Sequence, residues 1–259
     1  LKIKNYTLYL LKLGTIMQNH KLIIKNLSKK YKERTILKDI SMEINSGEII
    51  GLLGPNGAGK TTCFYSILGL TKADTGDIYL NQNKITNFPI HKRAKLGLGY
   101  LPQEMSIFRS LSVRNNILSI LELRNDINKE QQYNILEELL REFQIEHIAN
   151  SIGNHLSGGE RRRVEIARCV AQKPKFILLD EPFAGISPIA IQDIKKIIKE
   201  LAKKEIGILI TDHNVRDTLS ICDTAYIISD GLVLTEGTPN QILGNKEAKS
   251  VYLGESFSL

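Results

Sequence analysis

Short runs of apolar residues alternate along this chain with stretches in which apolar side chains recur every three or four positions. Two of these runs, residues 176–179 and 207–210, contain no polar side chain. Such runs are typical of strands that are buried on both faces of a parallel sheet. A third run, residues 48–53, leads directly into a glycine-rich segment. The pattern therefore predicts an α/β protein built on a parallel sheet.

Further strands are predicted on either side of this group, at 22–26, 36–44, 77–80, 226–229 and 232–236. A polar turn at 29–34 separates the first two, and the third follows a turn at 74–76. Asp230-Gly231 separates the last two, and this pair is typical of a tight hairpin turn. We expect these segments to supply an antiparallel β subdomain beside the parallel core.

Helical periodicity dominates the middle of the chain. Apolar residues lie three and four positions apart in 113–123 and 130–143, which predicts two amphipathic helices. A shorter helix is predicted at 61–68, where Gly69 ends it. We expect one domain covering residues 17–259, with a helical subdomain at about 105–172.

The composition is that of an ordinary globular protein, with 42% hydrophobic and 24% charged residues. Lys and Arg number 35 against 28 Asp and Glu, a net charge of +7. This balance admits nucleic acid, an acidic membrane surface or anionic small molecules as partners. The basic residues are spread along the chain in short clusters, so charge alone does not choose among the three.

Membrane spans, disulfides and zinc sites are not indicated. No apolar stretch approaches the roughly 20 residues that a membrane-spanning helix needs. Cys63, Cys169 and Cys222 lie far apart and form no CxxC pair, which argues against a disulfide framework and a zinc site. We interpret them as reduced core thiols, which favours a cytosolic protein.

Residues 1–16 alternate between lysines and apolar residues, and Met17 follows them. A signal peptide would carry a longer apolar core and a cleavage site with small residues. In this segment Lys12 interrupts the apolar run. We expect 1–16 to be a dispensable extension outside the domain, produced by a start assigned upstream of the true one. An amphipathic surface anchor is the alternative.

The glycine-rich segment at 54–61 carries the most specific chemistry. Its sequence, GPNGAGKT, matches the pattern G-x-x-x-x-G-K-[ST] between a predicted strand and a predicted helix. Glycines allow backbone amides to turn toward phosphate oxygens, and the helix N-terminus adds its positive end. Lys60 can reach the terminal phosphates and the Thr61 hydroxyl can bind Mg²⁺. A simple strand-to-helix turn is the alternative, and the Lys and Thr disfavour it.

Two acidic residues follow the buried strand predicted at 176–179. Asp180 and Glu181 come at its carboxyl end, where open α/β sheets bind ligands. Asp180 would hold Mg²⁺ through water, and Glu181 can polarise an attacking water molecule. A strand that ends in solvated acids is the alternative, and the upstream phosphate loop disfavours it.

The sequence LSGGE at 156–160 predicts a second anion site. Ser157 is a good helix N-cap, and Glu160 three residues later completes a capping box. The chain already contains one phosphate loop, so a second anion site calls for a second nucleotide and hence a head-to-tail pair of protomers. The arginine run 161–163 that follows is interpreted in part as a solvated helix face.

These three motifs together resemble those of the ABC ATPases, and the resemblance extends from about residue 22 to 253. It implies a P-loop NTPase core with an antiparallel β subdomain and a helical subdomain, which binds ATP and Mg²⁺ and hydrolyses ATP. Catalysis is then assigned to Glu181 and His213, and Mg²⁺ binding to Thr61, Gln103 and Asp180. The residues that would contact ATP are Tyr31, Gly54, Pro55, Asn56, Gly57, Ala58, Gly59, Lys60, Thr61, Thr62, Gln103, Ser157, Gly158 and Gly159.

One position departs from the family pattern. Many members carry an Asp before the Pro that follows the catalytic loop, and this chain has Ser187 before Pro188. The Asp assists communication between the two ATP sites, and Ser carries no charge, although it can donate and accept hydrogen bonds. Its role in this chain is left open.

Within the family, the segments SIFR (106–109) and ERRRVEIAR (160–168) are similar to those of the ATP-binding subunits of lipopolysaccharide export transporters. This resemblance implies a homodimer at the cytoplasmic face of the inner membrane, two separate transmembrane permease subunits as partners, and no nucleic acid. Phe108 and Arg109 would contact the permease; packing of Phe108 under the next helix is the alternative. A branched-chain amino-acid importer ATPase and a soluble ABC ATPase are the alternative functions.

Overall fold

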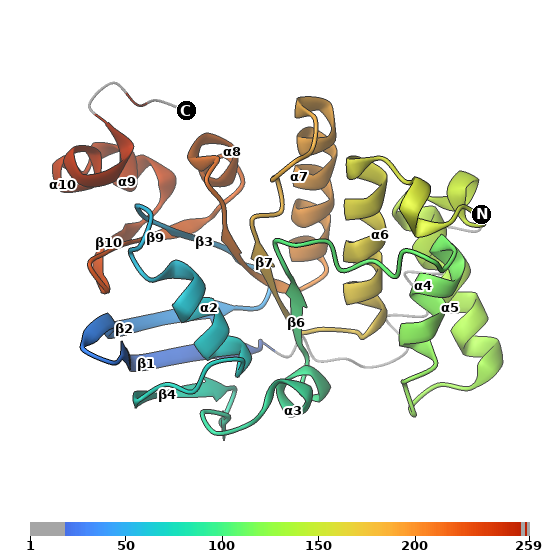
Figure 1. The fold of residues 1–259 in the computed structure, drawn as a ribbon, viewed down its shortest axis with the longest axis horizontal. Coiled ribbons are helices and arrows are strands. Elements are labelled where there is room, and N and C mark those ends of the chain that lie inside the picture. Colours follow the sequence, from blue (N-terminus) through green and yellow to red (C-terminus); the bar gives the residue numbers. More distant parts are fainter. Residues whose placement is uncertain (1–18, 255–256, 258–259) are drawn as a thin grey trace.

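A computed structural model of the chain describes residues 19–254 and 257, so the extension expected at 1–16 lies outside the described residues. Figure 1 shows strands in the middle and on one side of the molecule, and a group of helices at the other end. No helix of the described part is long and apolar enough to cross a lipid bilayer.

Within residues 19–254, ten strands form one sheet in the order β5-β4-β1-β2-β10-β9-β3-β8-β7-β6. The strands are β1 (Lys21–Tyr31), β2 (Arg34–Asn45), β3 (Ile49–Leu53), β4 (Thr75–Leu80), β5 (Asn83–Lys84), β6 (Leu98–Leu101), β7 (Phe176–Asp180), β8 (Gly207–Thr211), β9 (Thr224–Ser229) and β10 (Leu232–Gly237). Strands β9, β3, β8, β7 and β6 run parallel. Strands β1, β2, β4 and β5 are antiparallel. The predicted α/β class with an antiparallel portion is confirmed.

The parallel strands are buried on both faces, as their unbroken apolar sequence predicts. In β7, Phe176 and Leu178 pack on the side of the antiparallel strands, and Ile177 and Leu179 pack toward the helices on the opposite side. Because side chains alternate between the faces of a strand, a strand between two apolar layers must be apolar at every position. Only the strand ends are then free to carry polar groups.

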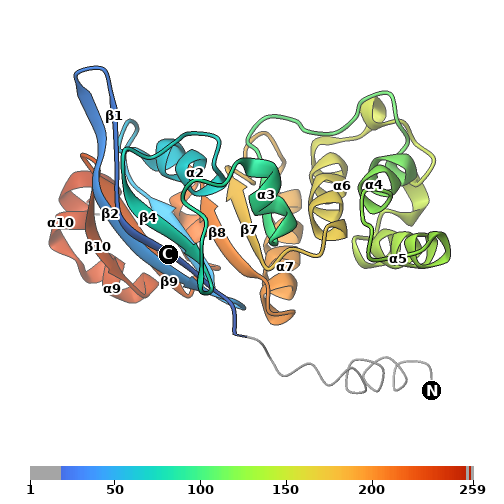
Figure 2. The ribbon, with the colours of Figure 1, turned by 90° about the horizontal axis from the view of Figure 1, so that it is seen from below.

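The polar turn predicted at 29–34 is shorter in the structure than the sequence indicates. β1 continues to Tyr31 and β2 begins at Arg34, so the turn consists of Lys32 and Glu33. The polar residues are tolerated in these strands because the tip of the hairpin extends past its neighbours and is exposed on both faces (Figure 2). The hairpin predicted across Asp230-Gly231 is confirmed, with Leu232 paired to Ser229.

The helices of the described part fall into a group around the sheet and a group at one end. They are α2 (Lys60–Leu68), α3 (Ile90–Lys95), α4 (Val113–Leu121), α5 (Lys129–Glu142), α6 (Gly158–Ala171), α7 (Pro188–Lys203), α8 (Val215–Leu219), α9 (Pro239–Gly244) and α10 (Lys246–Ala248). Helix α2 packs on one face of the parallel strands, and α6 and α7 pack on the other. Helices α4, α5 and α6 lie together at one end of the molecule (Figures 1 and 2), inside the range 105–172.

Helix α7 was not among the predicted elements, although its signals are present in the sequence. Ser187 is its N-cap and Pro188 occupies its first turn, a combination that favours a helix start. Ile191, Ile194 and Ile198 then recur at helical spacing and are buried. The departure from the family pattern at Ser187 therefore falls on a position where Ser performs a structural task.

This cap gives a prediction for Ser187. The Ser187 hydroxyl accepts a hydrogen bond from the Ala190 amide at 3.3 Å. Ser187→Ala should lower the free energy of unfolding by about 1 kcal/mol. Ser187→Asp should leave it unchanged or raise it slightly, because Asp also caps and its charge favours a helix N-terminus. Denaturant unfolding of the purified chain measures both, and an Asp variant as unstable as the Ala variant would contradict this assignment.

Candidate functional site

The loop between β3 and α2 has a backbone that only glycine can adopt at two positions. Gly54 has φ +149°, and a Cβ atom there would lie 2.0 Å from the carbonyl oxygen of Ile228. Gly59 has φ +108°, and its Cβ would lie 2.7 Å from Leu37. The loop is thus pressed against β9 on one side and β2 on the other. This packing fixes its course into the N-terminus of α2.

Lys60 is the first residue of α2 and is buried, with its side chain folded back under the loop. Its Nζ donates to the carbonyl oxygens of Gly54 at 2.7 Å and Pro55 at 3.0 Å. Burial lowers the pKa of Lys60, and the carboxylates of Glu181 and Asp180 oppose that shift. The first turn of α2 contains no acidic residue that would offset the positive end of the helix. The Lys60 ammonium group lies next to this helix end, against the loop 54–59. That arrangement suits a phosphate.

Asp180 is the last residue of β7, and its side chain is buried. Its Oδ2 accepts a hydrogen bond from the Tyr100 hydroxyl at 3.4 Å. Burial raises the pKa of Asp180, and the adjacent Glu181 raises it further. A buried carboxylate without a cation beside its oxygens is costly, and this chemistry fits a metal ligand.

Glu181 brings together residues from three loops. Its Oε2 accepts a hydrogen bond from Gln103 Nε2 at 2.7 Å, and its Oε1 lies 2.8 Å from His213 Nε2. Gln103 follows β6, Glu181 follows β7, and His213 follows β8. These strands are neighbours and parallel, so their carboxyl ends meet at one edge of the sheet.

The residue that holds this edge together was missed in the sequence. Arg162 of α6 is buried, and its guanidinium donates to the main-chain carbonyls of Asp180, Glu181 and Pro182 and to that of Pro102. It also pairs with Glu165 at 3.1 Å. Glu165 in turn accepts hydrogen bonds from the amides of Ser106 and Ile107.

The view of the run 161–163 as partly a solvated helix face is therefore wrong for Arg162, which is buried, whereas Arg161 and Arg163 are half-buried. Arg163 bonds Asp193 of α7 at 2.5 Å, and Arg161 donates to the carbonyl of Leu156. All three arginines contact neighbouring segments because α6 lies between α4, α7 and the loop after β6. The sequence signal was the Arg162–Glu165 spacing, which places two opposite charges on one helix face.

Ser157, Gly158 and Gly159 lie apart from the phosphate-type loop. Ser157 caps α6, and the predicted capping box with Glu160 is confirmed. A Cβ on Gly158 would lie 3.1 Å from the Gly185 carbonyl oxygen, so Gly158 lies against the segment that leads into α7. A Cβ on Gly159 would lie 2.9 Å from the Ala190 side chain in the first turn of α7. In the described residues no hydrogen bond joins 157–159 to 54–62, and Figure 1 shows β6 and β7 between α2 and α6.

The remaining predicted residues lie at the periphery. Tyr31 ends β1 and is 47% exposed, and Lys29 Nζ lies 5.2 Å from its ring centre. Phe108 is 45% exposed, so it is not a core residue, and its ring lies 4.3 Å under the guanidinium of Arg168. Arg109 is exposed beside it.

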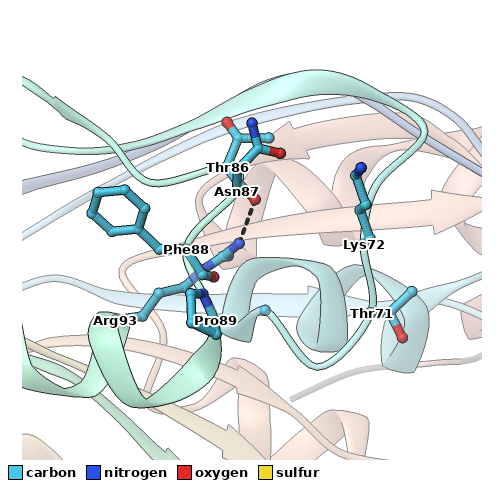
Figure 3. A pocket seen from close by; sticks show the side chains of 8 residues that line it. Thr71, Lys72, Thr86, Asn87, Phe88, Pro89 and Arg93 are labelled. Carbon is cyan, nitrogen blue, oxygen red and sulfur yellow. Dashed lines mark hydrogen bonds between the residues drawn. The ribbon is translucent and has the colours of Figure 1, made fainter.

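A hollow of about 340 Å³ lies elsewhere, between the end of α2 and the start of α3 (Figure 3). It is lined by Gly69, Thr71, Lys72, Thr86, Asn87, Phe88, Pro89 and Arg93. Arg93 donates to the carbonyl of Thr86 and to the carbonyls of Ser66 and Ile67 in the last turn of α2. Its guanidinium is thus engaged in anchoring the end of α2. None of the predicted site residues lines this hollow.

Comparison with known proteins gives a consistent assignment. The family described as ABC transporter matches residues 37–184. The lipopolysaccharide export system ATP-binding protein LptB of Escherichia coli K12 is 55% identical over 92% of this chain and 99% of its own length. The Haemophilus influenzae protein of the same name is 53% identical over the same shares.

Solved structures agree on the fold. An ATP-binding cassette of an ABC transporter in its ADP conformation superposes with a TM-score of 0.81 at 28% identity, over 91% of this chain and 99% of that one. A dimeric bacterial ABC transporter cassette superposes with a TM-score of 0.74 at 26% identity, over 84% and 98%. The chain therefore belongs to the ABC transporter family and has the fold of its ATP-binding cassettes.

Proposed function

We propose that this chain is the ATP-hydrolysing subunit of a transporter that extracts lipopolysaccharide from the inner membrane for export to the outer membrane. The assignment of ATP hydrolysis is supported by the contacts of Glu181 with both Gln103 and His213. Lys60 and Asp180 lie close to this group. The substrate rests on the 55% identity to a lipopolysaccharide export protein over 99% of that protein's length. This extent favours it over an amino-acid importer ATPase or a soluble ABC ATPase.

ATP and Mg²⁺ fit the residues present. The amides of 54–61 and the N-terminus of α2 would bind the phosphates, Lys60 would neutralise their charge, and Thr62 would add a hydroxyl. Thr61, Gln103 and Asp180 would hold Mg²⁺, which neutralises charge on the phosphates when it is bound. The lowered pKa of Lys60 and the raised pKa of Asp180 both reflect burial that such ligands would compensate.

Glu181 is the proposed base for hydrolysis. With its Oε2 held by Gln103 and its Oε1 by His213, the carboxylate is fixed in place and can accept a proton from water. His213 would also reach the terminal phosphate, because it is exposed at the same edge of the sheet. Tyr31 would stack on the adenine.

Two copies are proposed to complete each site. Ser157, Gly158 and Gly159 present a helix N-terminus that has no hydrogen bond to 54–62 in the described part of the chain. A head-to-tail dimer would bring this end of α6 onto ATP held by the other copy. The dimeric structure of a similar bacterial ABC transporter cassette supports a dimer.

The surface around Phe108 is proposed to bind a transmembrane permease subunit at the cytoplasmic face of the inner membrane. The proposed partners are two separate permease subunits, with no nucleic acid. An exposed aromatic ring beside Arg109 is the kind of pair that anchors interfaces. The residues just before Phe108 are held to α6, because the Glu165 carboxylate accepts hydrogen bonds from the amides of Ser106 and Ile107. Glu165 is also paired with Arg162. The same proposal places the ATPase domain at 17–259, with 1–16 outside it.

Glu181→Gln tests the base. The variant keeps its shape and ATP contacts but cannot accept a proton, so ATP hydrolysis should fall at least 100-fold and an ATP-bound dimer should accumulate in size-exclusion chromatography. In vesicles that contain the permeases and lipopolysaccharide, ATP-driven release of lipopolysaccharide should stop. Lys60→Ala should instead lose ATP binding itself. Parental hydrolysis by Glu181→Gln would refute the assignment.

Asp180→Asn tests the buried carboxylate. A carboxyl whose pKa is raised by folding destabilises the native state at any pH above that pKa, and the cost vanishes as pH falls toward its usual value of 3.8. The Asn variant should therefore melt at a higher temperature than the parent at pH 7, and the gain should shrink at about pH 4. Mg²⁺-dependent hydrolysis should be lost. A lower melting temperature at pH 7 would contradict the raised pKa.

Phe108→Ala tests the partner surface. The isolated chain should keep its ATP affinity and lose less than about 1 kcal/mol of stability, while its assembly with the permease subunits weakens. Phe143→Ala provides the matched control, because Phe143 is buried and its loss should cost about 3–5 kcal/mol. Equal destabilisation by both variants would support the packing alternative.

A further inference from the structure

Asp212 lies between β8 and the exposed His213, and its side chain is 4% exposed. The motifs at 54–61, 156–160 and 176–181 do not include it. Its Oδ2 accepts a hydrogen bond from the amide of Phe183 at 2.9 Å, and its Oδ1 accepts one from the amide of Asn214 at 2.8 Å. One buried carboxylate therefore joins two loops.

The two loops are those that carry Glu181 and His213. Phe183 follows Glu181 by two residues, and Asn214 directly follows His213. The side chains of Glu181 and His213 meet at 2.8 Å. Asp212 thus bonds the main chain beside each member of this pair.

The backbone of Glu181 requires such support. Its φ is +47°, a left-handed conformation that a non-glycine residue keeps only when its surroundings impose it. Arg162 holds the carbonyls of 180–182 from one side. Asp212 holds the amide of Phe183, so the carbonyls and the amide of this short loop have separate partners.

Burial raises the pKa of Asp212. The hydrogen bonds from the amides of Asn214 and Phe183 oppose this shift, as do the nearby side chains of His213 and Arg162. Asp180 is on the adjacent strand. Tyr252, in the C-terminal segment Lys249–Leu253, is also nearby: burial raises the pKa of the Tyr252 hydroxyl, and the charge of Asp212 adds to that rise.

We propose that Asp212 is a positioning residue for ATP hydrolysis: its two oxygens hold the loop of Glu181 and the loop of His213 in register, so that the two side chains stay in contact. The proposal rests on the roles of Glu181 and His213 given under the proposed function. Asp212 itself need not touch ATP, and it acts through the backbone of both loops.

Asp212→Asn tests the proposal with little change of shape. An amide group has one acceptor and one donor end, so it cannot accept from the amides of both Phe183 and Asn214. We expect kcat to fall roughly 10- to 100-fold, the loss typical of a misplaced catalytic group, with the KM for ATP changed less than about 3-fold. Asp212→Ser, which can accept from one loop only, should give the same split and replaces Asp212→Asn if that variant does not fold.

Asp223→Asn is the control. Asp223 also accepts a main-chain hydrogen bond, from the amide of Ile49 at 2.9 Å, but it is exposed and lies away from both loops. Asp223→Asn should keep the parental kcat and lower the melting temperature less than Asp212→Asn does, because Asp212 is buried and accepts from two amides. An Asp212→Asn variant with parental kcat, or one whose loss is entirely in KM, would overturn the proposal.

A double variant separates positioning from general damage. If Asp212 acts through Glu181, then Asp212→Asn should slow single-turnover hydrolysis of Glu181→Gln by less than about 2-fold, because residues that act as one unit are not additive. A full multiplicative loss would overturn the proposal. If Glu181→Gln alone hydrolyses ATP at the parental rate, the proposed function fails instead, and the two failures are distinguishable.

Discussion

The burial of the parallel strands between two apolar layers is the constraint on which the rest of the structure depends. Helix α2 covers one face of these strands, and α6 and α7 cover the other. Polar chemistry is excluded from the length of each strand and is pushed to its carboxyl end. Gln103, Asp180, Glu181 and His213 meet for this reason and share one edge, although more than a hundred residues separate the first from the last.

The sequence predicts most of this edge because each component has a local signal. The loop at 54–61 has its glycines and Lys60, and the strand before Asp180 is apolar at each position. Local signals do not reveal which polar groups are buried together. Arg162 and Asp212 were missed because their side chains bond main-chain atoms of other segments. Every residue has a main-chain carbonyl, and nearly every residue has an amide, so the sequence does not indicate which of them such a side chain will bond.

The same distinction explains the errors in the fold. The hairpin of β1 and β2 extends to Tyr31 and Arg34 although its tip is polar, because strand pairing does not require burial. Helix α7 was overlooked even though Ser187, Pro188 and the isoleucine spacing announce it. The first error reflects tertiary context that no local pattern contains, and the second reflects a signal that was available.

The ionisable groups of the site have a thermodynamic consequence for the protein without nucleotide. Burial lowers the pKa of Lys60 and raises those of Asp180 and Asp212, so each of these charged forms is held against its solvation preference. The site is a frustrated region of an otherwise consistently packed molecule. A ligand that brings both negative phosphates and a divalent cation would relieve this frustration from both sides at once. Nucleotide binding and folding stability are then linked quantities, and the cassette resists unfolding most when it is loaded.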